Sequence, residues 1–136
     1  MVTGTYVLLI ELAFDCELTI GALGERQLAA GWYAYVGSAF GPGGFSRIDR
    51  HRRVATEGID RPHWHIDYLL ERGELVDSYR APDRRIECHT ARQLPGTLID
   101  GVGASDCSCD SHLRYSPDER TFRTALETHL QAFSPE

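Results

Sequence analysis

The N-terminal third of the chain alternates apolar runs with glycine-containing turns, which is typical of the strands of an antiparallel sheet. Residues 5–12, TYVLLIEL, are apolar and rich in residues that favour strands, so they predict a buried strand. Three glycines divide residues 17–31 into a second strand and turns. The aromatic run WYAYVGS, at 32–38, predicts a third strand that pairs with the first.

Helical segments predominate after a glycine-rich loop, FGPGGF, at 40–45. The sequence predicts a helix over 46–58 that ends at Gly58, a shorter helix over 65–73, an edge strand over 74–81 and a helix over 84–94 that stops before Pro95-Gly96.

The last segment carries the clearest helix-start signal of the chain. After a turn-rich stretch at 101–115, Ser116 is predicted as the N-cap, Pro117 as the first helical residue and Glu119 as the capping-box partner. The apolar face of this C-terminal helix is predicted to consist of Phe122, Leu126, Leu130 and Phe133. We expect this helix to pack on the sheet and to be structural.

The composition is that of a globular protein with a real core. Of 136 residues, 42% are hydrophobic and 25% are charged, and a chain of this length predicts one domain over 1–136. No uncharged apolar run reaches the roughly 18 residues of a membrane span, and no secretory signal begins the chain. We therefore expect a cytoplasmic protein without membrane contact, in which thiols or metal ligands are favoured over disulfides for the four cysteines.

The charge distribution is uneven. All 14 basic residues are arginine and the net charge is −6, which argues against a general nucleic-acid coat protein. Residues 47–92, however, hold ten arginines against nine acidic residues. A locally basic strip on an acidic body can still contact phosphates. The alternative is a solvated acidic surface from a halophilic or GC-rich organism.

Several side chains in this region can carry chemistry. Arg47 and Arg50 share one face of the predicted helix, with His51 adjacent, and the planar guanidinium suits phosphate oxygens. Tyr6 and Tyr35 lie on strands predicted to be neighbours. The alternative is that these residues have no functional role. Tyrosines on strands usually pack in or beside the core, and arginines on one helix face usually point into solvent.

A histidine pair and a glutamate complete the set. In PHWHID (62–67) the predicted helix start makes the two imidazoles diverge, so one histidine acting as a proton carrier is favoured over a metal dyad. Glu87 lies in the middle of the predicted helix over 84–94. Its carboxylate is a surface group or, with substrate phosphate and waters, a ligand of Mg²⁺.

Taken together, these residues resemble the GIY-YIG nuclease superfamily. GTY (4–6), YVG (35–37), Arg47, His65 and Glu87 follow the order and spacing of that superfamily, over about residues 4–92. The stretches HWHIDYLL, ECHTARQL and GASDCSCDSHL are similar to a compact, mainly archaeal branch of it, and extend the similarity over nearly the whole chain. Some members of that branch are fused to DNA-repair glycosylases.

The resemblance implies an α+β fold, with an antiparallel sheet of about three strands flanked by helices, followed by a cysteine-containing loop and the C-terminal helix over 101–133. It also implies hydrolysis of nucleic acid with one Mg²⁺ or Mn²⁺ ion.

The resemblance also implies a role for each catalytic residue of this chain. Tyr6 or Tyr35 would orient or deprotonate the attacking water, and Arg47 would neutralise the charge of the transition state. His65 would assist proton transfer and Glu87 would bind the metal. Gly37, Ser38, Arg50 and His51 are expected to contact the substrate. The expected partners are DNA and a DNA-repair protein.

Three features depart from the superfamily pattern. Thr5 stands in the centre of the first tripeptide, where the family has isoleucine, and the difference is expected to be minor. The family's late asparagine has no clear match. Finally, Cys88, Cys107, Cys109 and His112 can complete a tetrahedral zinc site; the alternatives are buried thiols or a disulfide from Cys88, with His112 in the active cleft.

Three functions follow from these patterns. The leading hypothesis is a metal-dependent endonuclease for DNA repair or structure-specific cleavage. The second is a module of the same fold that binds nucleic acid or protein without cutting it. The third is an acidic structural domain in which the tyrosines, arginines and glutamate serve packing and surface.

Overall fold

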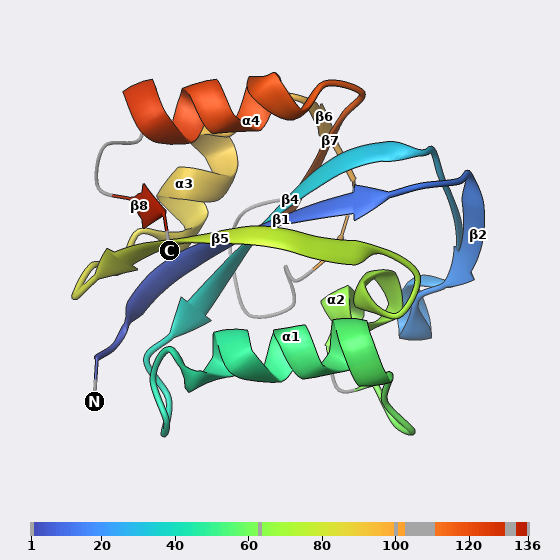
Figure 1. The fold of residues 1–136 in the computed structure, drawn as a ribbon, viewed down its shortest axis with the longest axis horizontal. Coiled ribbons are helices and arrows are strands. Elements are labelled where there is room, and N and C mark those ends of the chain that lie inside the picture. The colour runs from blue at the N-terminus through green and yellow to red at the C-terminus, as the bar shows by residue number, and fades with distance from the viewer. Residues whose placement is uncertain (1, 63, 100, 103–110, 130–132, 136) are drawn as a thin grey trace.

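An antiparallel sheet forms the centre of the molecule (Figure 1). The computed structural model describes residues 2–62, 64–99, 101–102, 111–129 and 133–135. The strands of the main sheet lie in the order β6 (Thr97–Leu98), β7 (Leu113–Ser116), β4 (Gly31–Ala39), β1 (Gly4–Leu12), β5 (Glu74–Pro82) and β8 (Ser134–Pro135). A separate hairpin contains β2 (Cys16–Thr19), the 3₁₀ turn η1 (Gly21–Leu23) and β3 (Glu25–Leu28).

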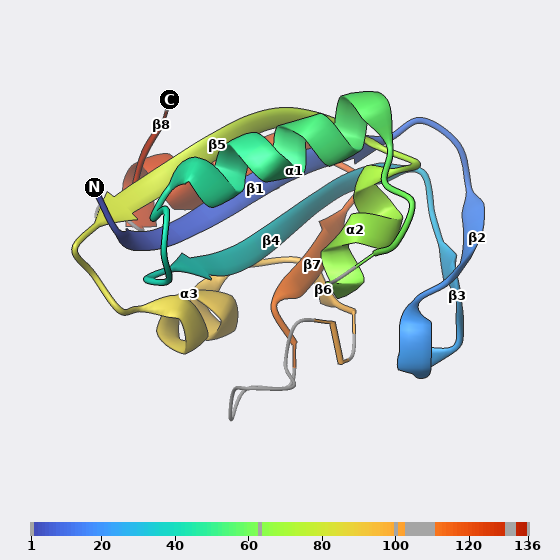
Figure 2. The same ribbon diagram turned by 90° about the horizontal axis from the view of Figure 1, so that it is seen from below.

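Helices cover both faces of the main sheet (Figure 1, Figure 2). On one face lie α1 (Ser46–Glu57) and α2 (His65–Leu70). On the other lie α3 (Glu87–Gln93), α4 (Glu119–Thr124) and the π-helical turn η2 (Ala125–His129). None of the helices within the described ranges is long and apolar enough to cross a membrane.

The central strand β1 separates two hydrophobic cores. Successive side chains of a strand point to opposite faces. Tyr6 and Leu8 accordingly belong to the core beneath α1 and α2, whereas Val7 and Leu9 belong to the core that includes Phe122 of α4. Because both faces of β1 are buried, its sequence is a continuous apolar run instead of an alternating one.

The predicted α+β class, with a mostly antiparallel sheet flanked by helices, is confirmed, but the expected number of about three strands is wrong. Within the described residues, the main sheet has six. β6 and β8 have two residues each and β7 has four, so they are too short to show a period in the sequence. The predicted pairing of the first strand with 32–38 is confirmed, since β1 pairs with β4. β5 is an edge strand for most of its length, because β8 pairs only with Tyr79 and Arg80.

The predicted start of the C-terminal helix is also wrong. Ser116 is the last residue of β7, and the helix begins at Glu119. The N-cap is Asp118, whose side chain accepts a hydrogen bond of 2.9 Å from the backbone nitrogen of Arg120. Ser116 instead accepts a hydrogen bond from the backbone nitrogen of Asp118, so its hydroxyl shapes the turn before the cap. Phe122, Leu126 and Phe133 are buried, and Leu130 lies outside the described residues.

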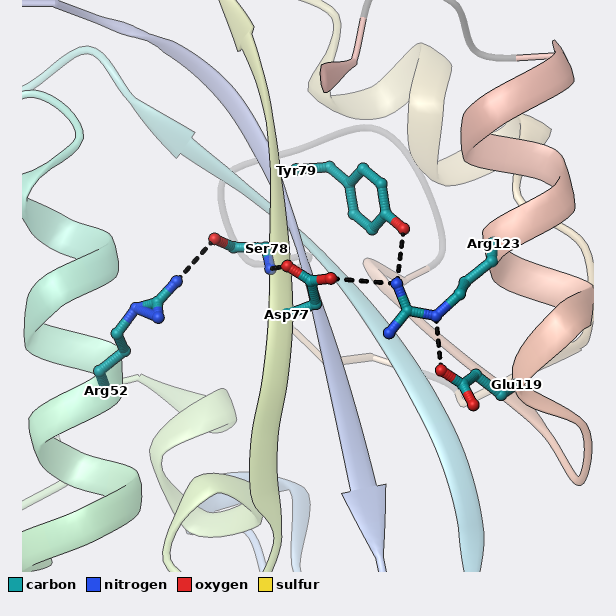
Figure 3. A network of polar contacts seen from close by, with 6 residues as sticks. All are labelled: Arg52, Asp77, Ser78, Tyr79, Glu119 and Arg123. Atoms are coloured by element: carbon teal, nitrogen blue, oxygen red, sulfur yellow. Dashed lines mark hydrogen bonds and ion pairs between the residues drawn. The ribbon is translucent and has the colours of Figure 1, made fainter. Parts of the chain in front are cut away.

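Polar contacts across β5 connect the helices on its two sides (Figure 3). On the α1 side, Arg52 donates a hydrogen bond of 3.0 Å to the hydroxyl of Ser78. On the α4 side, Arg123 donates to Asp77 and to the hydroxyl of Tyr79, both at 3.0 Å, and also to Glu119. Ser78 therefore contacts α1 on one face of the sheet, while its neighbours Asp77 and Tyr79 contact α4 on the other.

Candidate active site

The register between β1 and β4 brings the two expected tyrosines to one face of the sheet. Tyr6 lies opposite Gly37, and Tyr35 lies two residues away on the same strand as Gly37. Glycine is required at position 37, because a Cβ atom there would lie 2.3 Å from Cζ of Tyr6. The glycine of the YVG tripeptide therefore makes room for the ring of Tyr6, which is 1% exposed.

Helix α1 carries an arginine and a histidine to this tyrosine. The loop before it turns through Gly43 and Gly44, both with positive φ. Arg47 donates a hydrogen bond of 2.6 Å to the backbone carbonyl of Ser38, at the end of β4, and also hydrogen-bonds Tyr6. One turn further, Nε2 of His51 lies 2.8 Å from the hydroxyl of Tyr6.

An aromatic ring lies over this part of α1. The ring centroid of Trp64 is 4.8 Å from Cζ of Arg47 and 4.3 Å from Cζ of Arg50, which are cation–π distances. The ring of His51 lies 5.8 Å away. Trp64 is 37% exposed, so a large aromatic side chain reaches solvent beside the buried Tyr6 and His51.

A buried carboxylate fixes both Trp64 and Arg50. Asp67, in the first turn of α2, accepts two hydrogen bonds from Arg50, of 2.9 and 3.0 Å, and one of 3.1 Å from the backbone nitrogen of Trp64. Because Arg50 is held in this bidentate pair, its role in the structure is to position α2 against α1. The expected substrate contact of Arg50 therefore has to compete with Asp67.

Glu87 is the first residue of α3, and not a residue in the middle of a helix as expected. The segment before it is tied to β1 by Thr5, which is fully buried. The hydroxyl of Thr5 donates a hydrogen bond of 2.7 Å to the carbonyl of Arg84 and accepts one of 3.2 Å from the nitrogen of Ile86. The threonine in the first tripeptide therefore holds the segment from which Glu87 projects.

The charges of the site act on one another. Burial raises the pKa of Tyr6 and that of Tyr35; the carboxylate of Glu87 raises both further, whereas the guanidinium of Arg47 lowers both. Tyr6 and Arg47 are in direct contact, and Tyr35 and Glu87 lie within electrostatic range of them. Burial lowers the pKa of His51 to about 4, with Arg50 and Arg47 contributing and Asp67 opposing. At neutral pH the site thus holds two protonated phenols and an uncharged imidazole.

A protein-family comparison covers almost the whole chain. The model of the family described as Domain of unknown function DUF123 matches residues 5–134. The chain belongs to this family. The matched span runs from β1 to β8 and includes every residue of the site described above. No curated protein and no solved structure matches the chain.

The fold of this chain places Tyr6, Tyr35 and Arg47 together and Glu87 within electrostatic range of both tyrosines; these are four of the five expected catalytic residues. The imidazole that contacts Tyr6 is that of His51, expected only as a substrate contact, while His65 begins α2. Of the other expected substrate contacts, Gly37 accommodates Tyr6 and Ser38 anchors Arg47 through its carbonyl. His63 lies outside the described residues.

Sequence reasoning assigned no site role to Trp64 or Asp67. The signal for Trp64 was present in the sequence, because an aromatic residue stands between two histidines at the start of a helix. Asp67 follows three residues later, at the position of a carboxylate that caps the first turn. Their contact with the arginines of α1 depends on how the two helices pack, which no local pattern shows.

The expected cysteine cluster is only partly described. Cys107 and Cys109 lie outside the described residues, and Cys16 is a free cysteine. Cys88 is disulfide-bonded, which was one of the alternatives, and this contradicts the expectation of reduced thiols and its use as a zinc thiolate. His112 is buried, with Nδ1 3.8 Å from an oxygen of Glu87. It therefore belongs to the candidate active site, as the alternative placed it.

Proposed function

We propose that the chain is a divalent-metal-dependent endonuclease of the GIY-YIG type, which hydrolyses phosphodiester bonds in nucleic acid. The observation that carries the proposal is the convergence of two tyrosines, an arginine and a carboxylate from β1, β4, α1 and α3, with their charges acting on one another. These are the groups that the family resemblance implies, and they come from positions up to 81 residues apart in the sequence.

Arg47 supplies the positive charge for the transition state. Hydrolysis of a phosphodiester builds negative charge on the phosphate oxygens, and fixed donors at that place lower the barrier. Arg47 is fixed by its hydrogen bonds to the Ser38 carbonyl and to Tyr6. A guanidinium has five N–H donors, so others remain for phosphate oxygens.

The tyrosines orient the attacking water and do not act alone as bases. Their raised pKa values keep both hydroxyls protonated at neutral pH, and His51, with a pKa of about 4, is too weak a base to remove a proton from a phenol. Tyr6 is fixed by His51 and Arg47 and is 1% exposed, whereas Tyr35 is 8% exposed and is the more accessible of the two to a water molecule beside the phosphate.

The donor atoms at Glu87 fit a divalent ion. The carboxylate of Glu87, whose side chain is 28% exposed, lies near the imidazole of His112, and an ion bound there can also take waters and a substrate phosphate as ligands. When bound there, the ion supplies Lewis-acid charge to the phosphate and lowers the pKa of a water ligand.

Trp64 supports nucleic acid as the substrate. Exposed aromatic rings next to arginines are the usual surface on which unpaired bases stack. Trp64 is a third exposed and lies against Arg47 and Arg50. We propose DNA, in repair or structure-specific cleavage, as the substrate, with a DNA-repair protein as a partner.

The second candidate function is a binding module without catalysis. The observation that favours it is the lack of a strong base among Tyr6, Tyr35 and His51. Such a module binds nucleic acid through Arg47 and Trp64 and cleaves nothing with any divalent metal.

A substrate panel separates the two functions. Duplex, flap, abasic-site DNA and RNA are incubated with Mg²⁺ or Mn²⁺ at several salt concentrations, up to molar. The nuclease proposal predicts cleavage of at least one substrate by the wild type and by Glu71→Gln, an exposed carboxylate used as control. It predicts none by Glu87→Gln. Binding without cleavage under all conditions favours the module, and cleavage by Glu87→Gln at the wild-type rate contradicts the assigned metal site.

A further inference from the structure

The side chain of His112 lies next to Glu87, although the two residues come from different parts of the fold. Glu87 begins α3, and His112 directly precedes β7. Nδ1 of His112 is 3.8 Å from Oε1 of Glu87, and the ligand atoms of these residues and Cys88 all lie within 4.8 Å of one another. A buried nitrogen donor thus lies beside the carboxylate that was assigned to the metal.

The separation of these two atoms suits a shared ion better than a direct bond. At 3.8 Å the pair is too far apart for a hydrogen bond, which needs about 2.7–3.2 Å. Bonds of about 2.1 Å to one ion place neighbouring ligand atoms about 3.0–3.4 Å apart, for octahedral or tetrahedral angles. An approach of less than about 1 Å therefore brings both atoms onto the same ion.

His112 is also held in one orientation. Its imidazole hydrogen-bonds the backbone of Val36, and its own carbonyl accepts a hydrogen bond of 2.9 Å from the nitrogen of Val36. Its backbone nitrogen donates to the carbonyl of Val102 at 2.8 Å. Metal-binding histidines are usually oriented in this way, because a bond from the ring to a backbone group fixes the position of the ligand nitrogen.

We propose that Glu87 and His112 together form the metal site, and that the site therefore selects a divalent transition ion such as Mn²⁺ over Mg²⁺. Imidazole binds transition ions well, whereas Mg²⁺ is bound almost entirely by oxygen atoms. Cys88 supplies no thiolate, because it is disulfide-bonded. The remaining ligands are then water and substrate phosphate. This inference rests on the proposed function only in placing an ion at Glu87.

The site lies where the proposed chemistry needs it. Leu113, the residue after His112, pairs with Tyr35 across β4 and β7. The carboxylate of Glu87 acts on the pKa of Tyr35 and on that of Tyr6. An ion shared by Glu87 and His112 therefore lies within electrostatic range of both tyrosines.

The test is a metal-binding measurement on the full chain without nucleic acid. Free Mn²⁺ is followed by electron paramagnetic resonance during a titration, and Mg²⁺ affinity is obtained by competition. The proposal predicts that His112→Gln weakens Mn²⁺ binding about tenfold or more and Mg²⁺ binding by less than about twofold. Glu87→Gln should lose both ions. His89→Gln, an exposed histidine of α3, is the control and should lose neither.

Equal effects of His112→Gln on the two ions, or no effect on either, would overturn the proposal. Because His112 is buried, the variant is checked by circular dichroism, and a second measurement needs no variant. Pulsed electron paramagnetic resonance of the Mn²⁺-loaded wild type should show coupling to a ¹⁴N nucleus from a directly bound imidazole. Absence of that coupling also overturns the proposal.

The outcome separates this inference from the proposed function. If cleavage depends on Glu87 but Mn²⁺ binding is unchanged in His112→Gln, the inference about His112 is contradicted and the proposed nuclease function is kept. If Mn²⁺ binding depends on His112 but the chain cleaves no substrate, the metal site is supported and the proposed nuclease function is contradicted.

Discussion

At the scale of single residues, His51 is a histidine buried away from water beside Tyr6. It is 1% exposed, and its Nε2 lies 2.8 Å from the hydroxyl of Tyr6. Burial lowers its pKa from 6.5 to about 4. A protonated imidazole would have to share this space with Arg47 and Arg50, so the folded chain takes up the proton far less readily than the unfolded chain.

This shift predicts a pH dependence of stability. Between pH 6.5 and about 4 the unfolded state binds more protons at this position than the folded state, so the free energy of unfolding falls as the pH is lowered through that window. The expected loss from His51 is about 3 kcal/mol. Above pH 6.5 its contribution is fully present.

The measurement is urea unfolding of the wild type and of His51→Gln at several pH values from 7 to 4. Because other titrating groups are common to both proteins, the difference between their unfolding free energies should shrink as the pH falls. A difference that stays constant over the whole range contradicts the burial of an uncharged His51.

The identity of the histidine in contact with Tyr6 shows what the sequence could and could not predict at this scale. Tyr6, Tyr35, Arg47 and Glu87 were expected from the motif, and the structure brings their charges together. His65 was expected as the proton carrier, yet His51 contacts Tyr6, 45 residues away in the sequence. That contact depends on the packing of α1 against β1, which the spacing of residues along either element does not determine.

At the scale of secondary-structure elements, Thr5 connects β1 to the start of α3. Its hydroxyl donates a hydrogen bond to the carbonyl of Arg84 and accepts one from the nitrogen of Ile86, the residue before Glu87. A buried backbone group that loses its partner costs about 1–3 kcal/mol. The position of Glu87 therefore depends on a hydroxyl that an apolar side chain at position 5 cannot supply.

Thr5→Val should loosen the start of α3, because valine keeps the shape of threonine and lacks the hydroxyl. We expect faster amide hydrogen exchange at Ile86 by about tenfold or more, corresponding to at least about 1.4 kcal/mol. Thr5→Ser is the matched control, since it retains the hydroxyl and should preserve the slow exchange. Similar exchange at Ile86 in wild type and Thr5→Val would show that the hydroxyl does not hold this segment.

Arg123 has a corresponding role for α4 (Figure 3). It contacts Asp77, Tyr79 and Glu119, and about a quarter of its side chain is exposed. Arg123→Met should lower the free energy of unfolding by about 1–2 kcal/mol, because Tyr79 and the carboxylates lose a charged donor. Arg120→Met, on the exposed face of the same helix, is the control. Equal thermal stability of the two variants would contradict a role for this network.

The elements also differ in how well the sequence predicted them. β1, β4 and α1 are long and have clear apolar or helical patterns, and all three were predicted. β7 lies in a stretch that was predicted as turns, because its four residues pair with distant strands and carry no period of their own. The cap of α4 was misplaced by two residues, because Ser116 is used by β7 and Asp118 remains to cap the helix.

At the scale of the whole molecule, an acidic chain places two arginines side by side at the candidate active site. The net charge is −6, yet Arg47 and Arg50 come together beside Trp64. Exposed charges are screened by salt, whereas partly buried ones are screened less. Under the proposed function, such a chain would rely on a few fixed cations at the scissile phosphate, with Arg47 the first of them.

The measurement that tests this claim most directly compares two arginines of the same helix. Metal-dependent cleavage is measured at saturating substrate for Arg47→Ala and for Arg53→Ala, whose arginine is exposed, after thermal unfolding has shown that both variants are folded. If Arg47 stabilises the transition state, its variant should lose about 10²–10³-fold in rate, and the Arg53 variant should stay within about twofold of the wild type. Equal rates for the two variants would contradict the assignment of Arg47 and, with it, the active site.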